Sequence, residues 1–265
     1  MKKFKNKIVL ITGASSGIGA ETSKEFAIQG AKVLLLARNE KNLQKVANEI
    51  ISNGGEAEIF PVDVSDYNAV QETTEKIKKD IGVPDIIFNN AGGGKWRFIE
   101  ETDYKEAVDM ISVPYLGAFF ITKAFMPEML KRNTGHIVNM TSLPGFIPFS
   151  GATGYIASRK AMIGLHEALT ADLYGTGVKT SLSYFAKVET PYWQHNPESE
   201  ERLPTSQKII PVISAKKAAQ TIVRGVAKGK RKISAPFMIQ VVEFLTYLTP
   251  FITRFIMDQT GYKRK

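Results

Sequence analysis

Short apolar runs alternate with longer amphipathic stretches along most of the chain. The apolar runs predict strands at 8–12, 32–37, 57–62, 85–89, 135–141, 178–184 and 231–235. The stretches between them predict helices at 18–29, 40–52, 67–80, 103–131, 153–175 and 215–228. Strands this apolar are typical of a sheet that is buried on both faces, and their alternation with helices predicts parallel crossovers. The sequence therefore predicts one α/β domain, a doubly wound parallel sheet of the Rossmann type.

A different pattern begins at residue 236. Residues 236–257 are almost continuously apolar and aromatic, but Glu243, Pro250 and Arg254 interrupt them. These interruptions weigh against a membrane-spanning helix, and no segment before residue 236 is expected to span a bilayer. We therefore divide the chain into an α/β domain at 1–235, to which the dinucleotide-binding and catalytic motifs described below belong, and an apolar, basic helical extension at 236–265.

The net charge of +9 is concentrated near the C-terminal end. Residues 228–265 carry eight basic and two acidic side chains, which account for +6 of it. Because the excess is confined to one segment, no nucleic-acid partner is predicted. Two interpretations of 236–265 stay open: a hairpin on an anionic membrane surface, or a segment packed over a substrate cleft or in a subunit interface. The expected location is the cytoplasm, with peripheral membrane contact under the first interpretation.

The residue types exclude several kinds of chemistry. The chain has no cysteine, so disulfides, thiol catalysis and thiolate metal sites are excluded. The three histidines (His136, His166 and His195) are far apart and lack a metal-ligand spacing, so no metal site is predicted.

A glycine-rich turn joins the first predicted strand to the first predicted helix. Its glycines have a G-x-x-x-G-x-G spacing, which suits a tight turn, a close backbone approach to a pyrophosphate and close packing of helix on strand. The helix N-terminus then presents free N–H groups to the phosphates. A tight strand–helix connection is the simpler alternative, but the position in the first βα turn favours nucleotide binding. The predicted contacts are Gly13, Ser15, Ser16, Gly17, Ile18 and Gly19.

The second predicted strand ends at Arg38, where NAD-selective folds usually place an acidic residue. Arg38 can instead pair with the 2′-phosphate of NADP, so NADP(H) is predicted in preference to NAD(H). The alternative is a solvated arginine at a strand end.

Further motifs follow the later predicted strands in order: Asp63 and Val64 after the third, Asn90, Ala91 and Gly92 after the fourth, and Ser142 and Tyr155, thirteen residues apart, after the fifth. Together with the glycine-rich turn they resemble the short-chain dehydrogenase/reductase family over about residues 5–235. The resemblance implies that Asp63 and Val64 contact the adenine, with an N-cap as the alternative for Asp63. It also implies that a strand-end segment lines the cleft near the adenosine ribose, unless it is an ordinary turn; this segment is Asn90, Ala91 and Gly92.

The same resemblance implies a catalytic pair, Ser142 and Tyr155, separated by thirteen residues. Ser142 would hold the substrate oxygen, and Tyr155 would exchange a proton with it. Phenols ordinarily have a pKa near 10, so a nearby cation is needed to favour the phenolate. Arg159 replaces the family's lysine at this position, one helical turn after Tyr155, whereas Lys160 is rotated away from that face.

Two other departures from the family pattern lie nearby. Pro114 stands where the family has an asparagine that holds a water in the proton relay, and it is expected to kink the long helix. Phe185 and Ala186 replace a Pro-Gly turn, which predicts a less sharp or shifted loop. Val188 and Thr190 still match and would bind the nicotinamide carboxamide.

The resemblance implies a nicotinamide-dependent oxidoreductase that interconverts a carbonyl and an alcohol, with Tyr155 as acid and base. Arg38 makes NADP(H) the expected cofactor, and the apolar extension favours a small, hydrophobic substrate. The alternative is a non-catalytic relative that binds NADP(H) and acts as a regulatory or membrane-associated interaction protein, which Arg159 and Pro114 would also explain. Because family members commonly form dimers or tetramers, a homo-oligomer is a further expectation.

Overall fold

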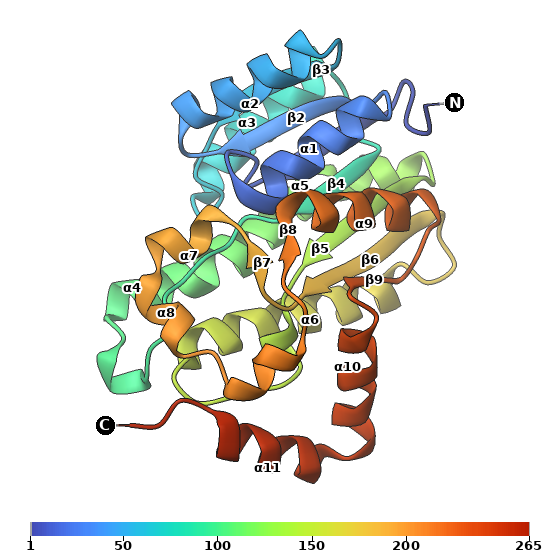
Figure 1. Ribbon diagram of the computed structural model, residues 1–265. Coiled ribbons are helices and arrows are strands. Elements are labelled where there is room, and N and C mark those ends of the chain that lie inside the picture. The colour runs from blue at the N-terminus through green and yellow to red at the C-terminus, as the bar shows by residue number, and fades with distance from the viewer. Residues whose placement is uncertain (1, 265) are drawn as a thin grey trace.

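The computed structural model describes residues 2–264, and its centre is a seven-stranded parallel sheet (Figure 1). The strand order is β3-β2-β1-β4-β5-β6-β9, so the direction of winding reverses between β1 and β4. In open α/β sheets, ligands bind beyond the carboxyl ends of the strands at such a reversal. The strands are β1 Ile8–Thr12, β2 Lys32–Ala37, β3 Glu56–Pro61, β4 Ile86–Asn89, β5 Gly135–Met140, β6 Val178–Phe185 and β9 Lys232–Ala235.

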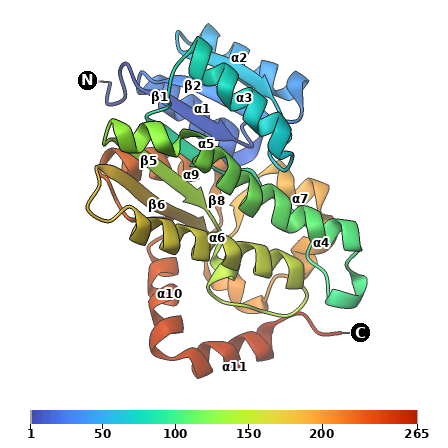
Figure 2. The same cartoon turned by 180° about the vertical axis from the view of Figure 1, so that it is seen from behind.

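Helices cover both faces of the sheet, as Figures 1 and 2 show from opposite sides. One face carries α1 Gly17–Ile28, α2 Glu40–Ser52 and α9 Ala215–Ala227. The other carries α3 Tyr67–Asp80, α5 Gly117–Lys131 and α6 Thr153–Asp172. The predicted doubly wound α/β fold is therefore confirmed.

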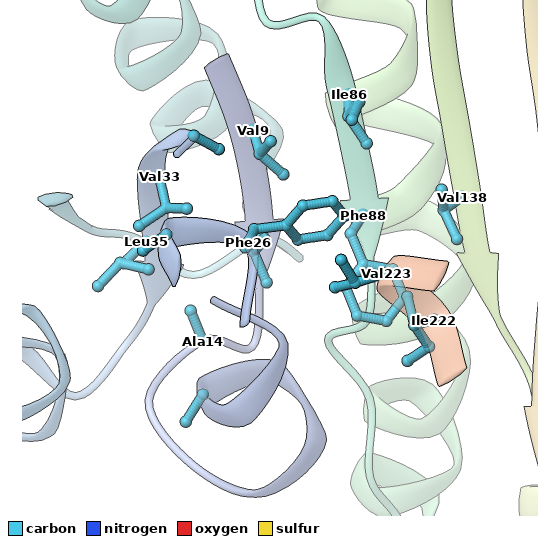
Figure 3. Close-up of a cluster of buried hydrophobic side chains, with 14 of the residues drawn as sticks. Val9, Ala14, Phe26, Val33, Leu35, Ile86, Phe88, Val138, Ile222 and Val223 are labelled. Carbon is cyan, nitrogen blue, oxygen red and sulfur yellow. The ribbon is translucent and has the colours of Figure 1, made fainter. Parts of the chain in front are cut away.

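The apolar runs are continuous because successive strand residues enter two different cores. In β1, Val9 faces the core under α1 and α9, and Leu10 faces the opposite core. Figure 3 shows Phe26 of α1 and Val223 of α9 packed against Val9 and Phe88 of the sheet. Each buried side chain of this size contributes roughly 1.5–3 kcal/mol to folding, so both faces of the sheet stabilise the domain.

The predicted helix at 103–131 is divided in two. Its parts are α4 Tyr104–Ile111 and α5, joined by the π-helical turn η2 Ser112–Leu116 around the buried Pro114. Proline has no N–H to donate, and the wider turn accommodates its ring. Contrary to expectation, the stretch Tyr104–Lys131 is long and apolar enough to cross a membrane by length and composition. Because α5 buries Ile121 and Phe125 against the sheet, we interpret it as a core helix.

Short elements gather beyond the carboxyl ends of the strands. The two-residue strands β7 Val188–Glu189 and β8 Ile213–Ser214 pair in parallel. The other elements there are α7 Pro191–His195, α8 Pro197–Glu201, and the 3₁₀ turns η1 Ile99–Glu101, η3 Leu143–Gly145 and η4 Thr205–Ile209.

The C-terminal extension forms two helices, α10 Met238–Leu248 and α11 Pro250–Thr260. Both views show α10 leaving the edge of the sheet and α11 turning back below the body of the molecule (Figures 1 and 2). The hairpin contacts the rest of the chain through β9 and η4. Its two ends are therefore close to the domain, and its tip projects.

Candidate active site

A cavity of about 780 Å³ lies beyond the carboxyl ends of the strands. It runs from the glycine-rich loop past the predicted catalytic pair to the inner face of α10 and α11. The cavity is lined by every site residue predicted from the sequence except Gly19, namely Gly13, Ser15, Ser16, Gly17, Ile18, Arg38, Asp63, Val64, Asn90, Ala91, Gly92, Ser142, Tyr155, Arg159, Val188 and Thr190.

The glycine-rich loop is shaped by backbone positions that exclude a side chain. Gly13 has a φ of +67°, and a Cβ there would lie 2.9 Å from the Cα of Ala91. A Cβ on Gly19 would lie only 2.2 Å from the carbonyl oxygen of Gly13, so Gly19 serves packing and not the cavity wall. Within the described chain, the side chain of Ser16 caps none of the first N–H groups of α1. Those groups are therefore left for an anionic ligand.

Asn90 fastens the end of β4 to this loop. Its side-chain nitrogen donates to the carbonyl oxygens of Thr12 at 3.0 Å and Gly13 at 3.3 Å. The Thr12 hydroxyl accepts from the backbone N–H groups of Asn90 and Ala91, both at 3.0 Å. Asn90 thus has a positioning role besides lining the cleft. The sequence reasoning missed Thr12, whose only signal was its place at the end of β1.

Asp63 and Arg38 lie at the outer end of the cleft. Oδ1 of Asp63 accepts from the N–H and the hydroxyl of Ser65 at 3.0 and 2.7 Å. Nη1 of Arg38 lies 3.8 Å from Oδ2 of Asp63. Burial alone would raise the pKa of Asp63, but these hydrogen bonds and the Arg38 charge outweigh it and lower the pKa. Asp66, and not Asp63, caps α3, so the N-cap alternative for Asp63 is wrong.

Ser142 follows β5 and Tyr155 lies in the first turn of α6, and both face the cavity. The Ser142 hydroxyl donates to the carbonyl oxygen of Phe185 at 3.3 Å. Tyr155 is 8% exposed, so its ring is held by packing and its edge meets the cavity. A substrate oxygen in this space would meet both hydroxyl-bearing side chains.

Arg159 is buried one turn after Tyr155, whereas Lys160 is exposed. The guanidinium carbon lies 4.7 Å from the centre of the Tyr155 ring, a cation–π contact. A Cβ on Gly92 would lie 2.8 Å from Nη1 of Arg159, so the guanidinium packs directly on that glycine. Nε of Arg159 is buried and has no hydrogen-bond partner among residues 2–264.

Aromatic side chains close one side of the cavity. The Trp96 ring centre lies 5.4 Å from that of Tyr155 and 5.6 Å from that of Trp193. Tyr192 lies 6.4 Å from Tyr155, and its hydroxyl donates to the carbonyl oxygen of Gly94 at 2.6 Å. Burial, and then the neighbouring Tyr155, raise the pKa of Tyr192, so its phenol stays protonated and keeps this hydrogen bond.

The far end of the cavity is apolar. Leu143, Ile147 and Ile210 line it from the domain, and Met238 and Val242 line it from α10. The sequence pattern did not reveal that the hairpin forms this wall. The inner face of the extension thus lines the cavity.

The loop after β6 is not a sharp turn. The strand continues through Phe185, and among the described residues only Asn6 and Asn133 are non-glycine residues with a positive φ. Thr190 lies beside the glycine-rich loop, because a Cβ on Gly17 would be 3.4 Å from the Thr190 Cβ. This loop therefore borders the cleft beside the start of α1.

A family model described as short chain dehydrogenase matches residues 7–201. The chain belongs to this family of oxidoreductases. Among its relatives is the fatty acyl-CoA reductase of Acinetobacter baylyi, which is 30% identical over 260 residues, or 97% of this chain and 85% of the relative.

Two solved structures share the fold and are each 25% identical in sequence. A short-chain dehydrogenase/reductase from Burkholderia phymatum in complex with NAD has a TM-score of 0.83, with both chains covered fully. An alcohol dehydrogenase from Thermococcus sibiricus, complexed with 5-hydroxy-NADP, has a TM-score of 0.75 over 86% of this chain and 95% of that one.

Proposed function

We propose that this protein is an NADP(H)-preferring oxidoreductase that interconverts a carbonyl and an alcohol on a hydrophobic substrate. One observation carries the proposal: a single cavity joins the glycine-rich loop, the Ser142–Tyr155 pair and an apolar far end. We place the enzyme in the cytoplasm and expect it to assemble into a homo-oligomer.

The residues present fit a dinucleotide. A Cβ on Gly13 would fill the space where the backbone approaches a ligand, and no side chain caps the first N–H groups of α1. The cationic side chain of Arg159 lines the same cavity. Arg38 supports the preference for NADP, because its guanidinium is largely exposed and can pair with a 2′-phosphate. When bound, a nicotinamide cofactor supplies hydride in one direction and accepts it in the other.

Residues of this chain bind the substrate oxygen and transfer a proton to or from it. Ser142 donates its hydroxyl hydrogen to the substrate oxygen and holds it. Tyr155 gives its proton to that oxygen during reduction and takes it back during oxidation. Arg159 holds a permanent positive charge against the Tyr155 ring, and a guanidinium does not release a proton. Tyr155 therefore exchanges its proton with water that reaches the cavity.

The substrate class follows from the far wall of the cavity. Its lining by Ile210, Met238 and Val242 suits an alkyl chain and offers no charge to a polar substrate. The similarity to a fatty acyl-CoA reductase supports a long-chain carbonyl compound. We therefore place the carbonyl at Ser142 and Tyr155 and the chain toward α10.

The test is oxidation of NADPH and NADH against a panel of short- and long-chain aldehydes and ketones. We expect turnover of long-chain carbonyls with NADPH, and a fall in kcat of at least about 100-fold for Tyr155→Phe, within the range of lost acid–base catalysis. Tyr174→Phe is the matched control, because Tyr174 is an exposed tyrosine just after α6. Equal turnover by wild type and Tyr155→Phe would contradict the role of Tyr155. Binding of NADPH without turnover of any carbonyl would instead favour the non-catalytic alternative.

A further inference from the structure

The α10–α11 hairpin has an apolar outer surface that nothing in the described chain covers. Ten of the twenty-one exposed large apolar residues in the described chain lie within its twenty residues 237–256. Soluble monomers rarely expose a contiguous apolar patch of this kind unless it binds something. We call it the hairpin patch; it consists of Phe237, Val241, Phe244, Leu245, Tyr247, Leu248, Phe251, Ile252, Phe255 and Ile256.

The base of the hairpin is fixed to the domain through its inner face. Glu243 is 4% exposed, and its carboxylate accepts from the Tyr184 hydroxyl and from Nζ of Lys232. Ile239 is fully buried one turn earlier on the same face. The one acidic residue of α10 therefore points into the protein, and the outer face carries no acid.

The far end of the hairpin is also fixed. Arg264 pairs with Glu100 at 3.3 Å, and its guanidinium carbon lies 4.8 Å from the ring centre of Phe98. The Ser150 hydroxyl donates to the carbonyl oxygen of Tyr262. With both ends attached, α10 and α11 present the hairpin patch in a fixed orientation.

The same two helices form the wall of the cavity. Val242 and Met257 line it from their inner faces. Leu245 and Ile256 belong to both surfaces, since they line the cavity and are 41% and 40% exposed. Ile209 of η4 also lines the cavity and is 71% exposed. The apolar end of the cavity thus reaches the surface between α10, α11 and η4, beside the hairpin patch.

The charges around the hairpin patch are mainly positive. Residues 249–264 contain Arg254, Lys263 and Arg264 against a single acid, Asp258. The Arg254 side chain is 84% exposed in the middle of α11, and its Nε lies 3.9 Å from Oδ2 of Asp258, so the excess positive charge of 249–264 comes from Lys263 and Arg264. A second copy of this face would bring like charges together, whereas an anionic phospholipid surface accepts both the apolar face and the cations. When the aromatic side chains of the patch enter the lipid, long cationic side chains beside them can extend back to the lipid headgroups.

We infer that the α10–α11 hairpin docks into the interfacial layer of an anionic phospholipid bilayer, with the mouth of the substrate cavity opening into the lipid. A long-chain carbonyl compound then enters the active site from the bilayer without crossing water. The docking is inferred only from the exposed apolar and charged side chains of the hairpin. The entry of substrate from the bilayer rests on the proposed function.

The first test is flotation of the full chain with vesicles of phosphatidylcholine alone or with about one third phosphatidylglycerol. We expect flotation with the anionic vesicles and a fall of at least about tenfold when three phenyl rings of the patch that do not line the cavity are removed. That variant is Phe244→Ser/Phe251→Ser/Phe255→Ser. The matched control removes three exposed apolar side chains elsewhere and should float like wild type; it is Ile28→Ser/Tyr104→Ser/Tyr174→Ser.

The second test compares turnover of a water-soluble short aldehyde with that of a long-chain aldehyde held in the same vesicles. The hairpin variant should keep turnover of the soluble aldehyde and lose at least about fivefold with the vesicle-held one, because only the latter depends on docking. Turnover of the soluble aldehyde by a wild type that does not float would overturn the docking and leave the proposed function standing. Flotation without turnover of either aldehyde would support docking and contradict the proposed function. The inference would also be overturned if the wild type is a dimer that does not float and the hairpin variant is a monomer. The patch would then be a subunit interface.

Discussion

Mild acid is expected to destabilise this protein through two buried histidines. His136 lies on β5, with Nε2 2.7 Å from the Ser181 hydroxyl oxygen. That hydroxyl donates its only hydrogen to the carbonyl oxygen of Lys230 at 2.5 Å, so His136 must donate Nε2–H to it. His166 is buried on α6, and its Nδ1 has no hydrogen-bond partner in residues 2–264. Neither ring has an acidic partner in these contacts to stabilise a positive charge.

Burial lowers the pKa of both histidines from the ordinary 6.5 to about 4, and a nearby lysine adds to the effect in each case. The lysine is Lys179 for His136 and Lys232 for His166. Between pH 6.5 and about pH 4, each histidine binds a proton in the unfolded chain but not in the folded protein. Stability therefore falls as the pH falls through this window, and it is unaffected by these groups above it.

The magnitude follows from the two pKa values. Moving from about pH 7.5 to about pH 5 lowers the free energy of unfolding by about 2 kcal/mol for each histidine, and so by about 4 kcal/mol for the pair. That is a large fraction of the roughly 5–15 kcal/mol by which native proteins are stable.

The assay is urea unfolding followed by tryptophan fluorescence at several pH values across this window. His136→Gln and His166→Gln should each remove about half of the pH dependence, and the double variant most of it. His195→Gln is the matched control, because that side chain is exposed. Comparing slopes against pH separates the titration from any loss of stability that the substitutions cause. If the double variant keeps the wild-type pH dependence, other groups are responsible and the reasoning is wrong.

Two further substitutions test the loop and the hairpin base. Gly19→Ala should weaken NADPH binding by at least about tenfold in a fluorescence titration, because its Cβ would lie 2.2 Å from a loop carbonyl oxygen. Gly164→Ala on α6 should bind normally, since no described atom beyond its chain neighbours and its own helix backbone lies within 4 Å of an added Cβ. Equal weakening in both variants would refute the steric cause. Glu243→Ala should lower the free energy of unfolding by about 2–3 kcal/mol, because the buried Tyr184 hydroxyl loses its acceptor. An unchanged urea midpoint would show that this anchor does not stabilise the fold.

The strands and most helices could be predicted because burial on both faces leaves a direct mark on the sequence. Residues 8–12 and 32–37 read as strands since every position must be apolar to enter one core or the other. The loop glycines could be placed for a similar reason, because tight backbone geometry admits few residue types. The sequence pattern thus reflects what each position needs locally, an apolar side chain in a buried strand or a glycine in a tight turn.

Contacts between distant segments leave no such mark. Trp96 and Trp193 are ninety-seven residues apart in sequence, and only the fold shows that their ring centres lie 5.6 Å apart beside Tyr155. The position of Arg159 on the helix face could be predicted from its spacing. Its stacking over the Tyr155 ring could not, because that depends on Gly92 from another strand end backing the guanidinium.

The extension shows how one charged residue can mislead a composition argument. Glu243 argues against a membrane-spanning helix, because a charged side chain is costly in a segment that lipid surrounds on all sides. A helix lying on a membrane needs only one apolar face. What matters for such a helix is therefore the position of Glu243 around the helix axis. At about 100° per residue, Glu243 lies about 40° from Ile239 around the helix, and both are buried against the domain. A single acid in an aromatic, apolar run therefore indicates which side of the helix faces the protein, and leaves the opposite side free for lipid.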